Sequence, residues 1–245
     1  MKGDVYITGG LDGNDSSSEA IRWSSQQGRM KRLPSMNECR HAHAMTAADR
    51  RVFALGGLQH IEDNISYLAS CEYLPHNNNR QFFGIFLCFC YNKLKIAFSM
   101  HLPPLFPLRW MPFPDMNKRR YKSAAIWVPQ YGVFCIGGYS DESQEEDSVE
   151  YIKLYEFGPQ QPWRLIKPML NPVSWPIVAQ INKCIFVLDG HSSSYQIQMI
   201  DVRSIPDEQW TIINHNNPFD DLFEPLSMTA RNDCLLLSSL SHSHF

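Results

Sequence analysis

Histidine and cysteine are the residues in this chain best suited to chemistry, because they supply metal ligands, nucleophiles and proton carriers. The 245 residues include nine histidines and seven cysteines. Cys88 and Cys90 are one residue apart but lack the second pair of ligands that a tetrahedral zinc site needs. His41 and His43, in "RHAHA", alternate along an expected strand and would share one face of it. We expect a structural or interface role for both histidines.

Catalytic signatures are also missing from the sequence. It has no His-Glu-x-x-His zinc motif, no Gly-x-Ser-x-Gly nucleophile elbow, no P-loop and no dinucleotide fingerprint. We therefore predict that the protein is not an enzyme and binds neither cofactor nor metal.

The net charge and the cysteine content indicate which kinds of partner and which cellular compartment to expect. The formal net charge is −3, which provides no basic field for nucleic acid or for an anionic membrane. The cysteines are scattered and odd in number, which is typical of a reduced intracellular protein, and the first residues, "MKGDVYITGG", do not resemble a signal peptide. We expect a cytoplasmic protein that does not bind nucleic acid or membrane.

An internal repeat indicates which elements would carry any functional side chains. Four segments read as an apolar strand that runs into small residues: "DVYITGG", "RVFALGG", "YGVFCIGG" and "KCIFVLDG". A fifth segment, "DCLLLSS", resembles them without the glycines. The glycines that mark the repeat are Gly9, Gly10, Gly56, Gly57, Gly137, Gly138 and Gly190. Self-similarity with a period of about 50 residues is typical of a repeat architecture.

A large apolar residue and a methionine follow the glycines at regular spacing. Trp110 and Trp163 each lie six residues before a methionine, Met116 and Met169, and Met30 precedes Met36 by the same interval. The final glycine of the next such segment, Gly57, Gly138 or Gly190, lies 21 or 22 residues beyond the methionine in all three units. Trp210 marks the fourth unit.

These markers resemble the kelch repeat. "RLPSMNECRHAHAMTAADRRVFALGGL" and "PFPDMNKRRYKSAAIWVPQYGVFCIGGY" are similar to the linker and first two strands of a blade in the kelch-like (BTB-kelch) proteins. The resemblance implies an all-β fold, a partial propeller of about four four-stranded antiparallel blades in an open arc, without a BTB or BACK region. The blades would cover residues 1–30 (partial), 31–113, 114–165, 166–213 and 214–245 (partial).

One segment breaks the period. The interval from Gly57 to Trp110 is 53 residues, against 20 to 25 in the other units, and removing Arg80 to Leu108 restores it. This insertion contains "FFGIFLCFCYNKLKIAF", whose unbroken apolar run of 10 residues is too short for a membrane helix. Two alternatives stay open: a native apolar insertion that docks on the propeller or on a partner, and a retained intron translated in frame, favoured by its Leu-, Pro- and Phe-rich end.

The candidate binding residues lie in loops at one end of the expected propeller, where the resemblance places partner peptides. The loops after the glycines are acidic and polar, and the linkers that lead into the next blade carry repeated arginines. A repeated arginine could equally bridge blades. The partner-binding candidates are Asp12, Asn14, His60, Glu62, Asp63, Tyr139, Asp141, Glu142, His191, Arg40 and Arg120.

By this resemblance alone, the expected function is protein binding, as the substrate-recognition propeller of a cullin-type ubiquitin ligase adaptor whose missing BTB region would engage the ligase. The alternatives are an actin-binding or cytoskeletal scaffold, which would be cytoskeleton-associated, and an enzyme like galactose oxidase, whose copper site we cannot assemble from the motifs here.

Overall fold

Short apolar runs rich in β-branched and aromatic residues form strands throughout the chain. The structure is a computed structural model that describes residues 4–75, 86–87, 108–140, 144–155, 161–190, 196–205, 207, 209–213, 225–231 and 234–239. Among these residues, strands make up all regular structure apart from one 3-10 turn, η1 (Val202–Ser204). The prediction of an all-β fold is confirmed.

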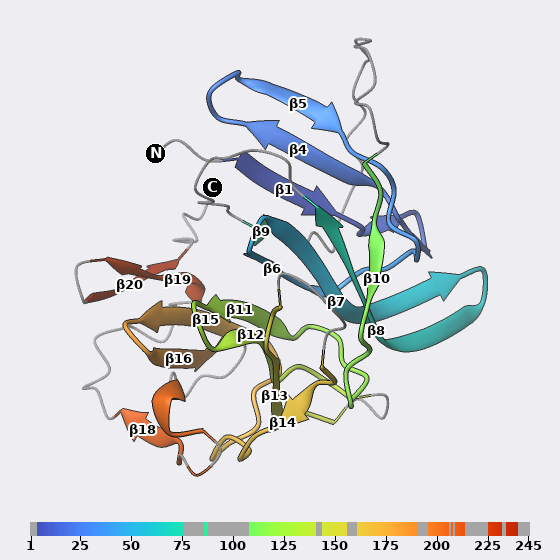
Figure 1. Ribbon diagram of the computed structural model, residues 1–245. Coiled ribbons are helices and arrows are strands. Elements are labelled where there is room, and N and C mark those ends of the chain that lie inside the picture. Colours follow the sequence, from blue (N-terminus) through green and yellow to red (C-terminus); the bar gives the residue numbers. More distant parts are fainter. Residues whose placement is uncertain are drawn as a thin grey trace, which may run out of the picture.

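Four four-stranded sheets follow one another along the chain (Figure 1). Sheet I contains β1 (Asp4–Thr8), β4 (Ala20–Ser24), β5 (Arg29–Arg32) and β9 (Phe86–Leu87). Sheet II contains β6 (Ala44–Ala48), β7 (Arg51–Ile61), β8 (Asn64–Pro75) and β10 (Met111–Phe113). Sheet III contains β11 (Ala124–Val128), β12 (Gly132–Ile136), β13 (Val149–Ile152) and β14 (Arg164–Leu165). Sheet IV contains β15 (Pro176–Ile181), β16 (Cys184–Asp189), β17 (Ile197–Asp201) and β18 (Thr211–Ile213).

Two strand pairs complete the described architecture. They are the pair of β19 (Pro225–Arg231) with β20 (Cys234–Ser239), and the small hairpin of β2 (Leu11–Asp12) with β3 (Asp15–Ser16). In sheets II to IV each strand pairs antiparallel with the next strand of that sheet along the chain. The first strands of successive sheets touch, β6 against β11, β11 against β15 and β15 against β19. This radial succession of blades is a partial β-propeller, as predicted.

Sheet I departs from the antiparallel pattern. Its fourth strand, β9, comes from the predicted insertion and pairs in parallel with β1, with Tyr6 opposite Phe86 and Ile7 opposite Leu87. The insertion lies between β8 and β10, the third and fourth strands of sheet II. Most of it falls outside the described residues, so both interpretations of its origin stay predictions. In the part of the chain that the structure describes, no helix is long and apolar enough to span a membrane.

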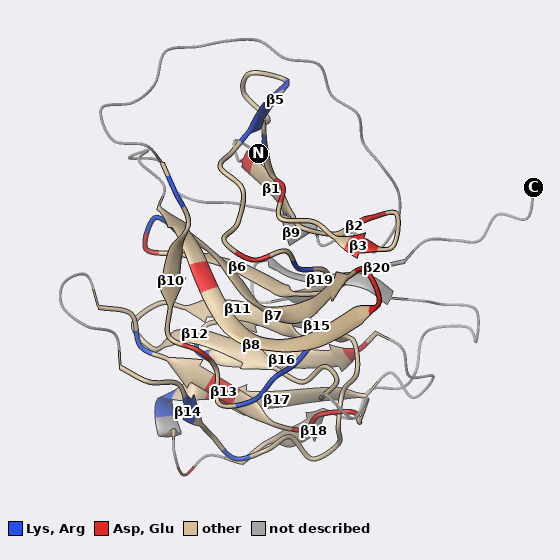
Figure 2. Ribbon diagram, turned by 90° about the vertical axis from the view of Figure 1, so that its right-hand side faces the viewer, with Lys and Arg blue, Asp and Glu red and all other residues tan. Residues whose placement is uncertain are grey.

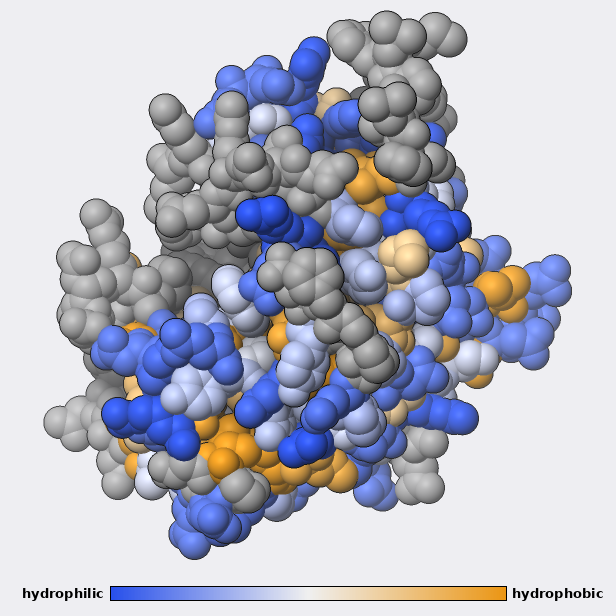
Figure 3. Space-filling model, in the orientation of Figure 1, coloured by the Kyte–Doolittle hydropathy of each residue, from blue (hydrophilic) through white to orange (hydrophobic). Residues whose placement is uncertain are grey.

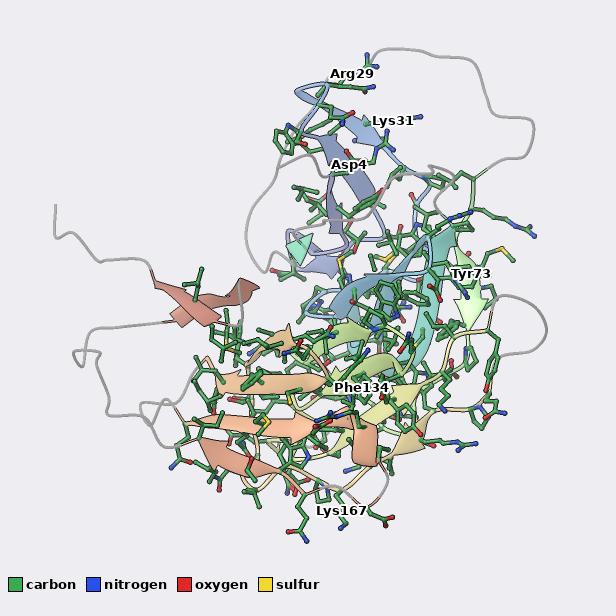
Figure 4. All side chains as sticks on the ribbon, turned by 60° about the vertical axis from the view of Figure 1, so that its left-hand side comes forward. Asp4, Arg29, Lys31, Tyr73, Phe134 and Lys167 are labelled. Atoms are coloured by element: carbon green, nitrogen blue, oxygen red, sulfur yellow. The ribbon has the colours of Figure 1, made fainter. Side chains whose placement is uncertain are left out.

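The apolar core lies between successive sheets. One buried cluster joins sheets I and II, a second joins sheets II and III, and a third joins sheets III and IV. Figure 4 shows Phe134 of β12 among the packed sheets, whereas Arg29 and Lys31 on β5 extend from the periphery. Both faces of an inner sheet are thus covered, which explains why β12, "GVFCI", reads as a continuous apolar run.

The tryptophan and methionine markers meet at the boundaries between successive sheets, which we call seams. The Trp110 indole Nε1 donates a 2.9 Å hydrogen bond to the Pro34 carbonyl, two residues before Met36. Trp163 donates in the same way to Pro114 (2.8 Å) and Trp210 to Lys167 (3.0 Å), each again two residues before a methionine. Each tryptophan therefore holds the linker that leads into its own blade.

The glycine doublets fix each blade to the next linker. Gly57 N–H donates to the Arg120 carbonyl at 2.9 Å, and Gly10 donates to Arg40 at 3.0 Å. Gly56 adopts a φ of +62°, and a Cβ there would stand 2.6 Å from the Arg120 carbonyl oxygen and 2.9 Å from the Met116 Cε. Only glycine permits both the left-handed backbone and this close approach.

The repeated arginines sit inside the blades. The Arg120 guanidinium is fully buried and donates to the carbonyls of Gly137 and Ser148 (3.0 Å each) and to Glu150 Oε1 (2.9 Å). Arg40 makes the same contacts with Gly56 (2.7 Å), Ser70 (3.0 Å) and Glu72 (3.1 Å).

The fourth sheet replaces both members of this ion pair. Val173 stands where Arg40 and Arg120 stand, and Gln198 accepts the Leu170 N–H (2.8 Å) as Glu150 accepts that of Asn117 (2.8 Å). Both charges are thus absent together from this unit. A buried charge without its partner is far costlier than a neutral pair.

Replacing Gly56 by alanine should destabilise the protein more than the same change at Gly13. Both glycines have positive φ, +62° and +68°, but a Cβ at Gly13 meets nothing within 4 Å. We expect Gly13→Ala to lower the free energy of unfolding by about 1 kcal/mol from backbone strain alone. Gly56→Ala adds a backbone clash and should cost at least about twice as much. Equal losses in urea unfolding would contradict this account of the doublet.

The buried ion pair of sheet III should be convertible to the neutral pair of sheet IV. We expect Arg120→Val to cost about 3 kcal/mol or more, because it leaves Glu150 buried and charged. The double variant Arg120→Val/Glu150→Gln should cost less than the sum of the two single changes by at least about 1 kcal/mol. Denaturant unfolding measures all three, with Arg119→Val at the exposed neighbouring residue as control. Additive losses would show that the two side chains act independently.

Candidate functional site

Two hairpins project from the end of the molecule at which the glycine doublets lie. The segment after Gly57, which the sequence predicts to be a polar loop, is instead a continuation of β7 and β8, whose ladder runs past Gly57 to the pair Ile61 and Asn64. Figure 1 shows this hairpin extending well beyond the rest of sheet II. The loop after Gly10 forms the second hairpin, β2–β3.

The two hairpins are bound to each other. The His60 ring Nδ1 donates to the Asn14 carbonyl at 2.6 Å, and the His60 N–H donates to Ser16 Oγ at 2.7 Å. The Glu62 N–H donates to Asp15 Oδ1 at 2.9 Å. These contacts join the connecting loops of sheets I and II into one surface.

A row of aromatic rings continues this surface to sheet III. Tyr67 on β8 lies against Tyr121, with ring centroids 5.6 Å apart, and Tyr121 stacks on Tyr139 at 5.3 Å. The main chains of Tyr121 and Tyr139 also exchange hydrogen bonds of 3.0 and 2.8 Å. Tyr121 belongs to the linker before β11, and Tyr139 follows the doublet after β12.

Lys122 carries the surface to sheet IV. Its Nζ lies 4.5 Å from the Trp175 ring centroid and 5.4 Å from that of Tyr139. Its N–H donates to the Ala42 carbonyl at 2.7 Å, and both Lys122 and Ala42 have left-handed backbones, with φ of +52° and +51°. Trp175 is 40% exposed. A cation at this distance from an aromatic face is attracted by the ring quadrupole.

We call this connected surface the loop ridge. It consists of residues 12–16 and 60–65 together with Tyr67, Tyr121, Lys122, Tyr139 and Trp175. Figure 3 shows apolar atoms at the tip of the β7–β8 hairpin, where Ile61 and Ile65 are 46% and 59% exposed. Figure 2 shows the acidic residues of β2–β3 close to those of the β7–β8 turn. The ridge therefore combines exposed apolar, aromatic and acidic side chains across four sheets.

The predicted binding residues have different positions in the structure. Asp12, Asn14, Glu62 and Asp63 are exposed on the two hairpins; His60 and Tyr139 are half-buried within the ridge. Three other candidates, Asp141, Glu142 and His191, lie outside the described residues. Arg40 and Arg120 are 1% and 0% exposed, so their prediction as partner contacts is wrong. Each guanidinium is bound to its own blade, which leaves no face for a ligand.

The binding residues predicted from the sequence do not include Tyr67, Tyr121, Lys122 and Trp175. A signal existed for three of them, because Tyr121 and Lys122 follow Met116 by five and six residues and Trp175 follows Met169 by six. The repeat therefore places Lys122 and Trp175 at the same position of successive linkers, with Tyr121 one residue before it. Tyr67 had no such signal, since it depends on the extra length of β7 and β8.

The two histidines near β6 do not alternate along a strand. Both precede Ala44, and the left-handed Ala42 between them turns the chain, so the prediction of a shared strand face is wrong. His41 Nδ1 hydrogen-bonds to Ser16 Oγ at 2.8 Å. Burial, and then the positive charges of His60 and Lys122, lower the pKa of His41. Among the described residues no carboxylate hydrogen-bonds to His41, so no catalytic triad is built on this contact.

His43 is a buried structural residue. Its Nε2 lies 2.8 Å from Thr8 Oγ1, in the seam between sheets I and II. Burial, and secondarily the Arg40 charge, lower its pKa to about 3, so the ring is neutral in the folded protein. Elsewhere in the described part of the chain, no group of three or more His, Cys, Asp or Glu side chains could hold a metal ion.

Comparison with known proteins identifies the fold and not the family. No family model matches the chain, and no curated protein matches it. A solved β-propeller titled "Structure of YjhT" superposes with a TM-score of 0.63 over 97% of this chain and 71% of that chain, at 9% sequence identity. An identity this low supports the propeller architecture alone.

The neutral His43 predicts a specific dependence of stability on pH. Its folded pKa of about 3 lies below the ordinary value of 6.5, so the unfolded chain binds the extra proton first and stability falls as the pH drops below about 6.5. Between pH 7 and pH 5 this group should remove about 2 kcal/mol from the free energy of unfolding. His43→Ser, which introduces the residue found at the equivalent Ser123, should lack this loss. Urea unfolding at both pH values tests it, and parallel pH dependences would contradict it.

Proposed function

We propose that this β-propeller is a non-enzymatic protein-interaction module that binds a partner protein through the loop ridge. The observation that carries the proposal is the unbroken series of contacts from Tyr67 to Trp175, which presents aromatic side chains from three sheets on one surface. Tyrosine and tryptophan are enriched where protein interfaces gain most of their binding energy.

The architecture of the ridge suits binding better than catalysis. Its rings and carboxylates are held by hairpins and linkers that the seams between blades anchor, so the surface is preorganised and loses little entropy on association. The Ser16 hydroxyl hydrogen-bonds to the His41 ring, accepts the His60 N–H and is buried. A hydroxyl engaged in this way positions the two hairpins.

The cellular context of this module follows from the resemblance of its linkers to those of the kelch-like proteins. We favour substrate recognition for a cullin-type ubiquitin ligase, in the cytoplasm, with the adaptor contacts made by a BTB region outside this chain. An actin-binding scaffold is the alternative, and a copper oxidase resembling galactose oxidase is a more distant one.

Removing the Trp175 ring should abolish capture of the partner. In quantitative affinity capture from cell extract, proteins held by the wild-type chain should be lost from Trp175→Ala. The control is Tyr155→Ala, because Tyr155 is almost equally exposed (38% against 40%) and follows β13 at the opposite end of the blade. Melting curves verify that both variants fold. If no captured protein depends on Trp175, the ridge is not the binding surface.

The captured protein then separates the three contexts. Its level should rise in cells depleted of the propeller protein if the context is a ubiquitin ligase. Co-sedimentation of the chain with actin filaments would instead support the scaffold, and stoichiometric bound copper would support the oxidase.

A further inference from the structure

The chemistry of the loop ridge indicates what kind of segment it binds, given that the proposed function holds. Its exposed charges are mostly acidic: Glu62 and Asp63 occupy the turn of the β7–β8 hairpin, and Asp12 lies on the adjoining hairpin. The two hairpins are hydrogen-bonded together, so these carboxylates belong to one surface. A partner that brings positive charge would meet complementary potential here.

The aromatic half of the ridge already holds a cation. Lys122 Nζ stands 4.5 Å from the centroid of the Trp175 ring, 5.4 Å from Tyr139 and 5.7 Å from Tyr121. Three rings, from the linkers that enter sheets III and IV and from the loop after β12, thus lie within 5.7 Å of one ammonium group, while Trp175 keeps 40% of its surface exposed. The exposed part of the ring can accept a second cationic side chain, and guanidinium groups favour such faces.

Exposed aliphatic side chains lie beside the carboxylates. Ile61 and Ile65 flank the Glu62 and Asp63 turn and are 46% and 59% exposed. Arginine and lysine carry apolar stems that cover such side chains while the charged end reaches a carboxylate. An acidic or purely apolar segment would satisfy only one part of this combination.

We propose that the partner contributes an extended basic segment, whose arginine or lysine side chains pair with Glu62 and Asp63 and stack on Trp175. Lys122 competes with the incoming side chain for the Trp175 ring and repels its charge. The carboxylates and the Trp175 ring of the ridge therefore both favour a cationic side chain, whereas Lys122 lowers the affinity for it.

A labelled peptide of alternating glycine and arginine is the probe, with glycine–glutamate and glycine–serine peptides for comparison. We expect fluorescence anisotropy to show binding of the arginine peptide alone, weakened by added salt. Glu62→Gln/Asp63→Asn should weaken it about fivefold, and Trp175→Ala by about threefold to tenfold.

The matched control removes two acidic charges from the opposite end of the blades. Asp49 lies in the turn between β6 and β7, and Asp207 lies between β17 and β18. Asp49→Asn/Asp207→Asn changes the net charge equally and should alter affinity by less than about twofold, since distant exposed charges are screened. Equal losses of affinity in the two double variants would show that binding depends only on the net charge of the protein, and would overturn the proposal.

Lys122→Met should change the affinity for a basic partner and for an acidic partner in opposite directions. Removing the competing ammonium should tighten the arginine peptide about twofold or more. A weaker arginine peptide, or binding of the glutamate peptide that depends on Lys122, would overturn the proposal. Capture that depends on Trp175 would still support protein binding in that case, so failure of the basic segment is distinguishable from failure of the proposed function.

Discussion

One backbone hydrogen bond, from the second residue of each glycine doublet to the carbonyl of the following linker, sets how successive blades meet. It occurs at Gly10, Gly57 and Gly138, with donor–acceptor distances of 3.0, 2.9 and 2.8 Å. Its geometry demands a backbone without Cβ, because the neighbouring main chain approaches closely. The methionine that packs against the doublet and the tryptophan that hydrogen-bonds to the linker then fill the seam. This contact fixes the linkers that enter sheets II, III and IV against the preceding sheet.

Charge inside the blades depends on the same geometry. The linker that accepts the glycine N–H carries an arginine into the interior, where a glutamate on the third strand of the same sheet neutralises it. Five oxygen atoms accept hydrogen bonds from the Arg40 guanidinium and four from that of Arg120, so the desolvation cost is offset by charge-assisted hydrogen bonds. The fourth sheet loses both charges together, at Val173 and Gln198, and its backbone contact to Gly138 is kept. The backbone bond is therefore the constant feature and the ion pair a variable one.

The fold could be predicted from the sequence, because glycines, methionines and tryptophans recur at fixed intervals and these residues form the contacts between successive sheets. The site was less predictable. The repeated arginines could be read as surface or interior, since their glutamate partners lie about 30 residues away and no local pattern joins them. The extent of β7 and β8 was also hidden, because a polar strand that projects into solvent has the composition of a loop. Tyr67 owes its place in the ridge to that extension.

The division of labour within each linker has an evolutionary consequence. The Arg120 backbone carbonyl binds the preceding blade, whereas its guanidinium binds residues of its own blade only. A blade that is duplicated or exchanged thus brings its interior charge balance with it, and has to match its neighbour in the main-chain hydrogen bond and in the apolar packing between the sheets. The neutral pair Val173 and Gln198 in the fourth sheet needs no matching charge in sheet III, because the guanidinium contacts of Arg40 and Arg120 stay within their own sheets. Diversification of the exposed loops can then proceed blade by blade on a common frame.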